Sequence, residues 1–193
     1  MPPENPVTVT ASFRGLIMEP SIVPELGVLE KTQDSISNPN VIGNMSITTF
    51  PDGSVAARTA TVESIDRAGF TAPPILGSAS MNGTYRILST ENIARTDGAT
   101  TYDVSTLEGP VTVAVNFATG TVTANTDVLD VVASVSGTEL TGTATHNGVS
   151  GDLRGIAGQD PVLSRNFVFG LFQGASPEEG KAFAGGIKAH SGF

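Results

Sequence analysis

The sequence predicts an all-β protein, a barrel or a sandwich, and three observations lead to this prediction. Short segments alternate apolar and polar side chains, so that the apolar ones share one face of a sheet. Turn signals such as Pro51-Asp52-Gly53 and Asn147-Gly148 separate these segments at close spacing, which is not typical of a parallel α/β sheet. Glycines recur between residues 137 and 158, where they favour the bends of a small barrel.

The strands expected in the first part of the chain are Val7–Phe13, Ile42–Phe50 and Ser54–Val62. Pro51-Asp52-Gly53 joins the last two into a hairpin, because proline fixes φ and glycine permits the turn. The Pro-rich residues 19–40 alternate poorly. They are expected to form a long ordered loop, or one helical turn around Glu25–Lys31.

Phe70–Ser80 contains two adjacent prolines and is the expected connector to the second part of the chain. Gly83–Leu88 follows as a strand, and a polar stretch covers residues 92–100. Asn147-Gly148 predicts a type I′ turn, because both residues tolerate positive φ. The later strands are expected at Val111–Phe117, Thr121–Ala124, Val131–Ser136, Glu139–His146, Val149–Gly155, Arg165–Phe172 and Ala182–Ala189.

Length, charge and cysteine content restrict the function. The chain has 193 residues, enough for one domain, or one domain with a smaller annex, and a buried core. Its 19 acidic and 10 basic side chains give a net charge of −9, which argues against a nucleic-acid partner. The absence of cysteine excludes a disulfide framework, thiolate catalysis and Cys-ligated metal. All apolar runs are far shorter than the ~20 residues of a membrane-spanning segment, and no cofactor is expected.

Three segments resemble motifs of the transferrin-binding protein B-like β-barrel domain. Val115–Thr123 resembles its V-D-F-x-x-G-T-L-T hairpin, and Gly137–Leu153 resembles its F-S-G-T-A-x-Y-N-G-x-S-G-D-L hairpin. Gly170–Gly185 is similar to its closing G-x-F-Y-G-P-x-A-x-E-x-G-G-x-F segment. The three matches follow the order of the family and together cover roughly residues 108–190.

The resemblance implies an antiparallel eight-stranded barrel in the C-terminal half, over residues 108–193. It implies a smaller, β-rich, handle-like region over residues 1–107, where no motif matches and the assignment follows from position alone. It also implies a non-enzymatic binding role on or outside a bacterial cell. Relatives bind host iron proteins, haem or complement regulators.

The chain departs from the family in three places. Relatives are commonly secreted or lipid-anchored, whereas residues 1–6 are polar and Pro-rich and the chain has no cysteine. A mature form with a start methionine, or a protein not exported through a signal peptide, is therefore expected. Gln173-Gly174-Ala175 replaces the Tyr-Gly-Pro of the closing motif. Extra residues after Ile156 lengthen a loop whose candidate partner contacts are Gly158, Gln159, Asp160 and Pro161.

His146 is the candidate haem ligand, because a neutral imidazole coordinates iron. The resembled motif has tyrosine at this position, which favours a semi-exposed packing role instead. His190, three residues from the last residue, has no stronger claim.

The carboxylates are interpreted as structural. Aspartates occur in or near turns, where they bond to their own backbone, and the chain has no D-x-D-x-D-G loop for calcium. Glu178 and Glu179 are adjacent, so on an extended chain they would point to opposite faces and not form an acid–base pair. The sequence also lacks a nucleophile elbow, a zinc-protease motif and a P-loop, and no enzyme is expected.

Phe167 and Phe169 would share one face of a strand, which favours the filling of a barrel interior. The alternative is an exposed aromatic anchor for a partner.

Two functions remain open at this point. The first is a binding module that presents loops to a protein partner, or to haem, at a bacterial cell surface. The second is a structural component of a larger assembly, such as a virion decoration, cement or tail protein, whose partners are neighbouring copies. The three motifs favour the first function, and the missing export signal favours the second.

Overall fold

The computed structural model describes residues 9–14, 30–38, 41–50, 53–61 and 69–192. No helix among these residues is long and apolar enough to cross a membrane. The strands are β1 (Val9–Arg14), β2 (Glu30–Asn38), β3 (Val41–Thr49), β4 (Val55–Thr61), β5 (Ser78–Thr96), β6 (Ala99–Asn116), β7 (Thr121–Asn125), β8 (Asp130–Ser136), β9 (Glu139–His146), β10 (Val149–Asp160), β11 (Arg165–Ser176) and β12 (Lys181–Ser191).

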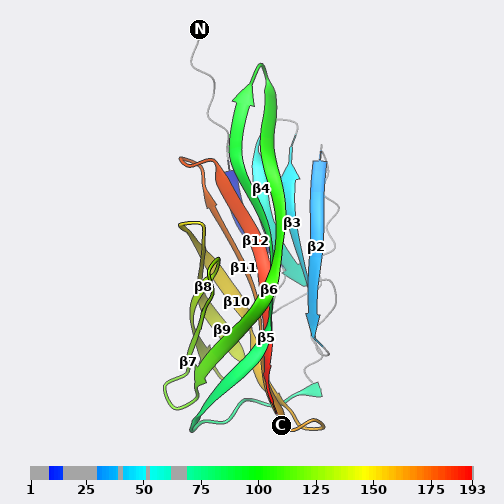
Figure 1. Cartoon of the computed structure of the whole chain (residues 1–193). Coiled ribbons are helices and arrows are strands. Elements are labelled where there is room, and N and C mark those ends of the chain that lie inside the picture. The colour runs from blue at the N-terminus through cyan, green and yellow to red at the C-terminus, as the bar shows by residue number, and fades with distance from the viewer. Residues whose placement is uncertain (1–8, 15–29, 39–40, 51–52, 62–68, 193) are drawn as a thin grey trace.

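Strands β5 to β12 form a closed antiparallel barrel, in which each strand pairs with the next one along the chain (Figure 1). The last strand, β12, pairs with the first, β5, from Ala182↔Thr90 to Ser191↔Met81, and this seam closes the barrel. The eight-stranded antiparallel barrel expected in the second part of the chain is therefore confirmed.

The barrel begins at Ser78, so the boundary expected at residue 108 falls inside β6 and is corrected to the connector before β5. The far ends of β5 and β6 pair with each other as a hairpin that rises above the other strands (Figure 1). Residues 103–106 of this hairpin are all exposed. Because neither face of this part of the hairpin is buried, its sequence does not need alternating apolar and polar residues. Without that alternation, the sequence resembles a polar loop.

Strands β1 to β4 form a separate four-stranded sheet in the order β1-β4-β3-β2, with β1 parallel to β4. The expected hairpin between β3 and β4 is confirmed, and Gly53 adopts a φ of 83° in its turn. Pro51 and Asp52 lie outside the described residues. The loop expected over residues 19–40 contains the strand β2, and residues 25–29 of the expected helical turn lie outside the described residues.

The barrel interior is filled by an apolar cluster that includes Met81, Leu140, Phe172 and Phe183. Alternation along the strands accounts for this filling, since every second side chain of a barrel strand points inward. The Asn147-Gly148 turn that brings β9 back as β10 has positive φ at both residues, 49° and 80°, as predicted.

A second apolar cluster lies between the outer wall of the barrel and the four-stranded sheet. It contains Ile47 from the sheet, and Phe167, Phe169 and Leu171 from β11. Phe167 and Phe169 do share one face, but that face is the outer one, so the expectation that they fill the barrel interior is wrong. The interior positions of β11 belong to Val168 and its even-numbered neighbours.

Glycines allow the sheet to approach the barrel wall closely. A Cβ atom added to Gly186 would lie 2.4 Å from Cγ2 of Ile36, and one added to Gly43 would lie 2.4 Å from Cδ2 of Leu171. Only a residue without a side chain fits at these positions, because an apolar side chain of the other layer occupies the space that a Cβ atom would need.

Two polar contacts fix the sheet on the wall. The buried Thr59 hydroxyl donates to Oε1 of Gln173 at 2.5 Å. Nε of Arg86 lies 2.7 Å from Oδ2 of Asp34, which joins β5 to β2. The Thr59–Gln173 hydrogen bond is directional, so it defines how the sheet lies on the barrel more than apolar burial alone would, and the Arg86–Asp34 ion pair adds an electrostatic attraction between the two layers.

Candidate binding site

His146 is a core residue with both ring nitrogens engaged. Its side chain is 2% exposed, and its ring packs edge-on against Phe183 at 5.6 Å. Nδ1–H donates to the carbonyl oxygen of Val128 at 2.8 Å, because a carbonyl can only accept. Nε2 lies 3.0 Å from Oγ of Ser89 and accepts its hydrogen when the imidazole is neutral. This arrangement leaves neither nitrogen for iron, and the ring is buried rather than semi-exposed.

The Ser89–His146 pair places a hydroxyl beside an imidazole, the pairing that activates serine nucleophiles. Ser89 is also buried, and the pair lies inside the barrel beside the interior cluster. A nucleophile must reach its substrate, so burial makes this contact a structural hydrogen bond that satisfies two polar side chains in an apolar core.

The candidate contact loop after Ile156 is largely strand. Gly158, Gln159 and Asp160 continue β10, and the turn proper covers residues 161–164. Gly158 is buried, and Gln159 exchanges two backbone hydrogen bonds with Thr71 of the connector. Oδ1 of Asp160 accepts the backbone N–H groups of Val162 and Leu163 at 2.8 and 3.0 Å. Pro161 is exposed at the tip.

Backbone hydrogen bonds join the loops at one end of the barrel, which we call the connector end. It comprises the connector (residues 69–77), the turns at residues 117–120, 137–138 and 161–164, and the end of β12. Phe117 N–H donates to the Gly77 carbonyl and Val135 N–H to that of Gly120, both within 3 Å. Ala157 N–H donates to the Thr138 carbonyl at 2.9 Å. With the Thr71–Gln159 pair, these bonds hold the connector-end loops against the barrel rim.

The connector end exposes large apolar side chains. Ile75 and Leu76 of the connector are 83% and 74% exposed, and Val162 and Leu163 of the 161–164 turn are 87% and 43% exposed. Of the large hydrophobic side chains that are exposed in the described residues, only Val104 and Val132 lie elsewhere. Exposed apolar groups that gather on one face of a protein mark an interaction surface more often than isolated ones.

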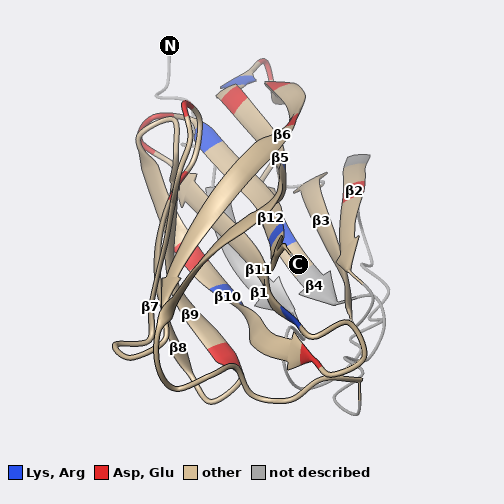
Figure 2. Ribbon diagram, turned by 60° about the horizontal axis from the view of Figure 1, so that its bottom comes forward, with Lys and Arg blue, Asp and Glu red and all other residues tan. Residues whose placement is uncertain are grey.

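The opposite end of the barrel is acidic, and we call it the hairpin end. Figure 2 marks acidic residues around the tip of the β5–β6 hairpin and on neighbouring turns, with others spread along the barrel strands. Exposed members are Asp97, Asp103, Asp127, Glu178 and Glu179. Lys181 lies 3.1 Å from Oε2 of Glu179. Among the described residues, no group of three or more His, Asp or Glu side chains is placed to hold a metal ion.

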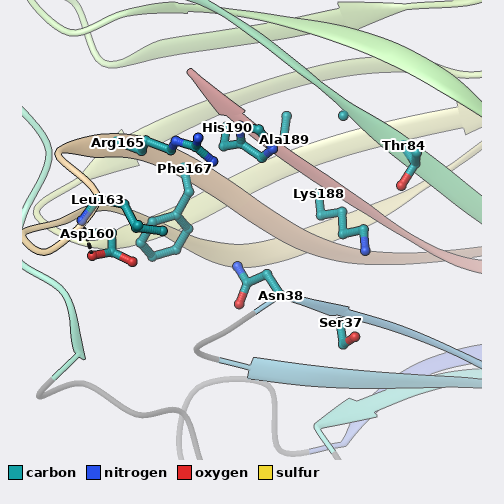
Figure 3. A pocket seen from close by; sticks show the side chains of 11 residues that line it. Ser37, Asn38, Thr84, Asp160, Leu163, Arg165, Phe167, Lys188, Ala189 and His190 are labelled. Atoms are coloured by element: carbon teal, nitrogen blue, oxygen red, sulfur yellow. Dashed lines mark hydrogen bonds between the residues drawn. The ribbon is translucent and has the colours of Figure 1, made fainter. Parts of the chain in front are cut away.

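A pocket of about 380 Å³ opens on the outer wall near the connector end, beside the last residues of β2. Figure 3 shows Arg165 and His190 on one side of this pocket and Lys188 nearer to Asn38 and Ser37. Strand register explains the gathering, because His190 is the partner of Phe167 across β11–β12 and Lys188 is the partner of Thr84 across β12–β5.

Reasoning from the sequence missed both features of the connector end. Ile75 and Leu76 are an apolar pair directly after two prolines, and such a pair in a connector is a usable signal of an exposed contact. Lys188 is one of only three lysines in an acidic chain, but it lines the same pocket as Arg165 only because β11 and β12 pair in their particular register.

No protein-family model matches the chain, and no curated protein is similar enough to count as a relative. Among solved structures, the apo haemoglobin receptor HpuA from Kingella denitrificans matches over 80% of this chain and 56% of its own, with 15% identity and a TM-score of 0.38. HpuA from Kingella denitrificans in complex with human haemoglobin matches over 81% of this chain and 57% of its own, with 18% identity and a TM-score of 0.41. The chain thus spans a little over half of the length of these receptors.

Proposed function

We propose that this protein is a non-enzymatic binding module of a bacterial cell surface, which docks a protein partner at the connector end of its barrel. The observation that carries the proposal is the exposure of Ile75, Leu76 and Val162 at one end of the barrel. The three segments that resemble motifs of transferrin-binding protein B-like barrels support the placement at the cell surface. The buried Ser89–His146 pair gives no support to catalysis.

The partner that fits this end presents an apolar patch with neutral or acidic surroundings. The connector end carries Arg165 and Lys188 on its flank, whereas the hairpin end carries exposed carboxylates that would repel an acidic surface. Below the connector, a small cavity of about 130 Å³ is lined by Pro74, Val115 and Phe117 among others. An apolar side chain of the partner could enter it beside Ile75, as anchor residues do at the centre of interfaces.

The test compares two double variants, each of which replaces two exposed apolar side chains by serine. Leu76→Ser with Val162→Ser removes exposed apolar groups at the connector end, and Val104→Ser with Val132→Ser removes two elsewhere. We expect a protein retained by the wild type on an affinity column to be retained by the second variant and lost by the first. Hydrogen exchange in the complex should then protect residues 71–77 and 159–164.

Two results would overturn this function. One is a partner that the connector-end variant retains and the Val104/Val132 variant loses. The other is a protein that remains intact when proteases are added to whole cells, since a surface module must be accessible from outside.

A further inference from the structure

We propose that the pocket on the outer wall is a binding site for a small organic acid, a carboxylate joined to an apolar group. This inference goes beyond the docking of a protein partner and does not depend on it. It concerns the pocket of about 380 Å³ that contains Arg165, Lys188 and His190. Its volume lies at the small end of the range of ligand sites, about 300–1,000 Å³.

Cationic side chains dominate this pocket although the chain as a whole has a net charge of −9. Lys188 is half-buried, and among the described residues its ammonium group has no ion pair or hydrogen bond. A half-buried ammonium without a counter-charge is unfavourable, so an anion that enters the pocket would be attracted to it. Arg165 contributes a second permanent positive charge on the opposite side of the pocket (Figure 3).

Asp160 is the one carboxylate among the residues that line the pocket. Its Oδ1 atom accepts the backbone N–H groups of Val162 and Leu163, which directs this oxygen into its own turn. The formal charge of the lining with neutral His190 is therefore positive by one, from Arg165, Lys188 and Asp160. The hydroxyl groups of Ser37 and Thr84 supply uncharged donors near Lys188.

The pocket has an apolar side, which favours the binding of an organic acid over that of an inorganic anion. Phe167 lines the pocket and is fixed from behind by Phe70, whose ring meets it edge-on at 5.2 Å. Leu163 and Ala189 extend this surface. A phosphate or sulfate ion would use the cations but leave the apolar side in water, whereas an aromatic or aliphatic acid would cover both.

Phenylacetate is a suitable probe, followed by the backbone amide signals of the full chain in two-dimensional NMR. We expect saturable shifts at Leu163, Phe167 and Ala189. Phenethylamine, which has a similar shape and the opposite charge, should produce none. Inorganic phosphate should bind at least about tenfold more weakly than phenylacetate, because it lacks the apolar part; a tenfold ratio corresponds to about 1.4 kcal/mol.

Variants locate the charge that the acid recognises. Lys188→Gln should weaken phenylacetate binding by about tenfold or more, as expected for the loss of a charge-assisted contact. Lys181→Gln is the matched control at the hairpin end, where Lys181 pairs with Glu179, and its binding should equal that of the wild type. The comparison of phenylacetate with phenethylamine uses only the wild-type protein, so it tests the site even where a variant folds poorly.

Three results would overturn the organic-acid site. They are phenethylamine shifting the same amides as phenylacetate, phosphate binding as tightly as phenylacetate, and Lys188→Gln binding phenylacetate like the wild type. None of these results affects the proposed protein partner, which is tested through Leu76 and Val162, outside this pocket.

Discussion

At the scale of single residues, His146 shows how a polar side chain is accommodated in the core, because both of its ring nitrogens have hydrogen-bond partners. His146 joins Ser89 of β5 to Val128 of the turn after β7, and thereby bridges strands on different sides of the barrel interior. A buried donor or acceptor that loses its partner costs more than the bond itself contributes, because it remains desolvated. His146 therefore contributes to the unique packing of the core.

His146→Ala should lower the free energy of unfolding by about 1–3 kcal/mol, because Ser89 and the Val128 carbonyl would lose their partner in a buried site. Urea denaturation followed by circular dichroism measures this difference. His190→Ala is the control, since His190 is exposed, and its effect should stay within about 0.5 kcal/mol. Equal stability of the two variants would contradict the structural role of His146.

At the scale of elements, the sheet and the barrel depend on one shared apolar layer. The even positions of β11 face the barrel interior, and its odd positions, among them Phe169 and Leu171, are covered by the four-stranded sheet. Such a strand is buried on both faces and loses its alternation, in the way that strands of parallel sheets do. The sequence from Phe167 to Phe172 is accordingly an almost continuous apolar run.

Ile47→Ala should lower the free energy of unfolding by about 2–5 kcal/mol, because Ile47 is fully buried between the two layers and leaves a cavity there. Val132→Ala, on an exposed position of β8, is the matched control and should change stability by no more than about 0.5 kcal/mol. Both values come from the same urea denaturation experiment. If Ile47→Ala proved as harmless as the control, the shared apolar layer would not be a source of stability.

Strand β11 also shows which parts of the fold could be predicted from the sequence and which could not. Turn chemistry and alternation correctly predicted most strands from Val111 onward, because each has one inward and one outward face. The outer face of β11 was assigned to the wrong layer, since periodicity shows that Phe167 and Phe169 share a face but not which neighbour covers it. The pocket could not be predicted from the sequence. Arg165, Lys188 and Ser37 line one pocket only because β11, β12 and β5 pair in a particular register and β2 packs beside them.

At the scale of the whole molecule, sheet and barrel should unfold together. The outer wall of β11 and β12 carries buried apolar residues, among them Phe169 and Leu171, that share an apolar cluster with residues of the four-stranded sheet. A barrel that lost the sheet would present Phe169, Leu171 and Ala184 to water, an apolar surface large enough to promote association.

A chain restricted to residues 69–193 retains all eight barrel strands but lacks the sheet. We expect it to bind the dye ANS and to associate in analytical ultracentrifugation, unlike the full chain, because its outer wall is uncovered. A stable monomer of residues 69–193 that melts at the temperature of the full chain would contradict the dependence of the barrel on the sheet.

The seam between β5 and β12 joins the two strands that are farthest apart along the barrel sequence. All other barrel pairs are neighbours in the chain and can form as soon as each hairpin has been synthesised. Closure must wait until Lys181–Ser191 has emerged, and until then β5 keeps one edge unpaired. The order of synthesis therefore makes the growing chain most prone to aggregation just before its final strand is complete.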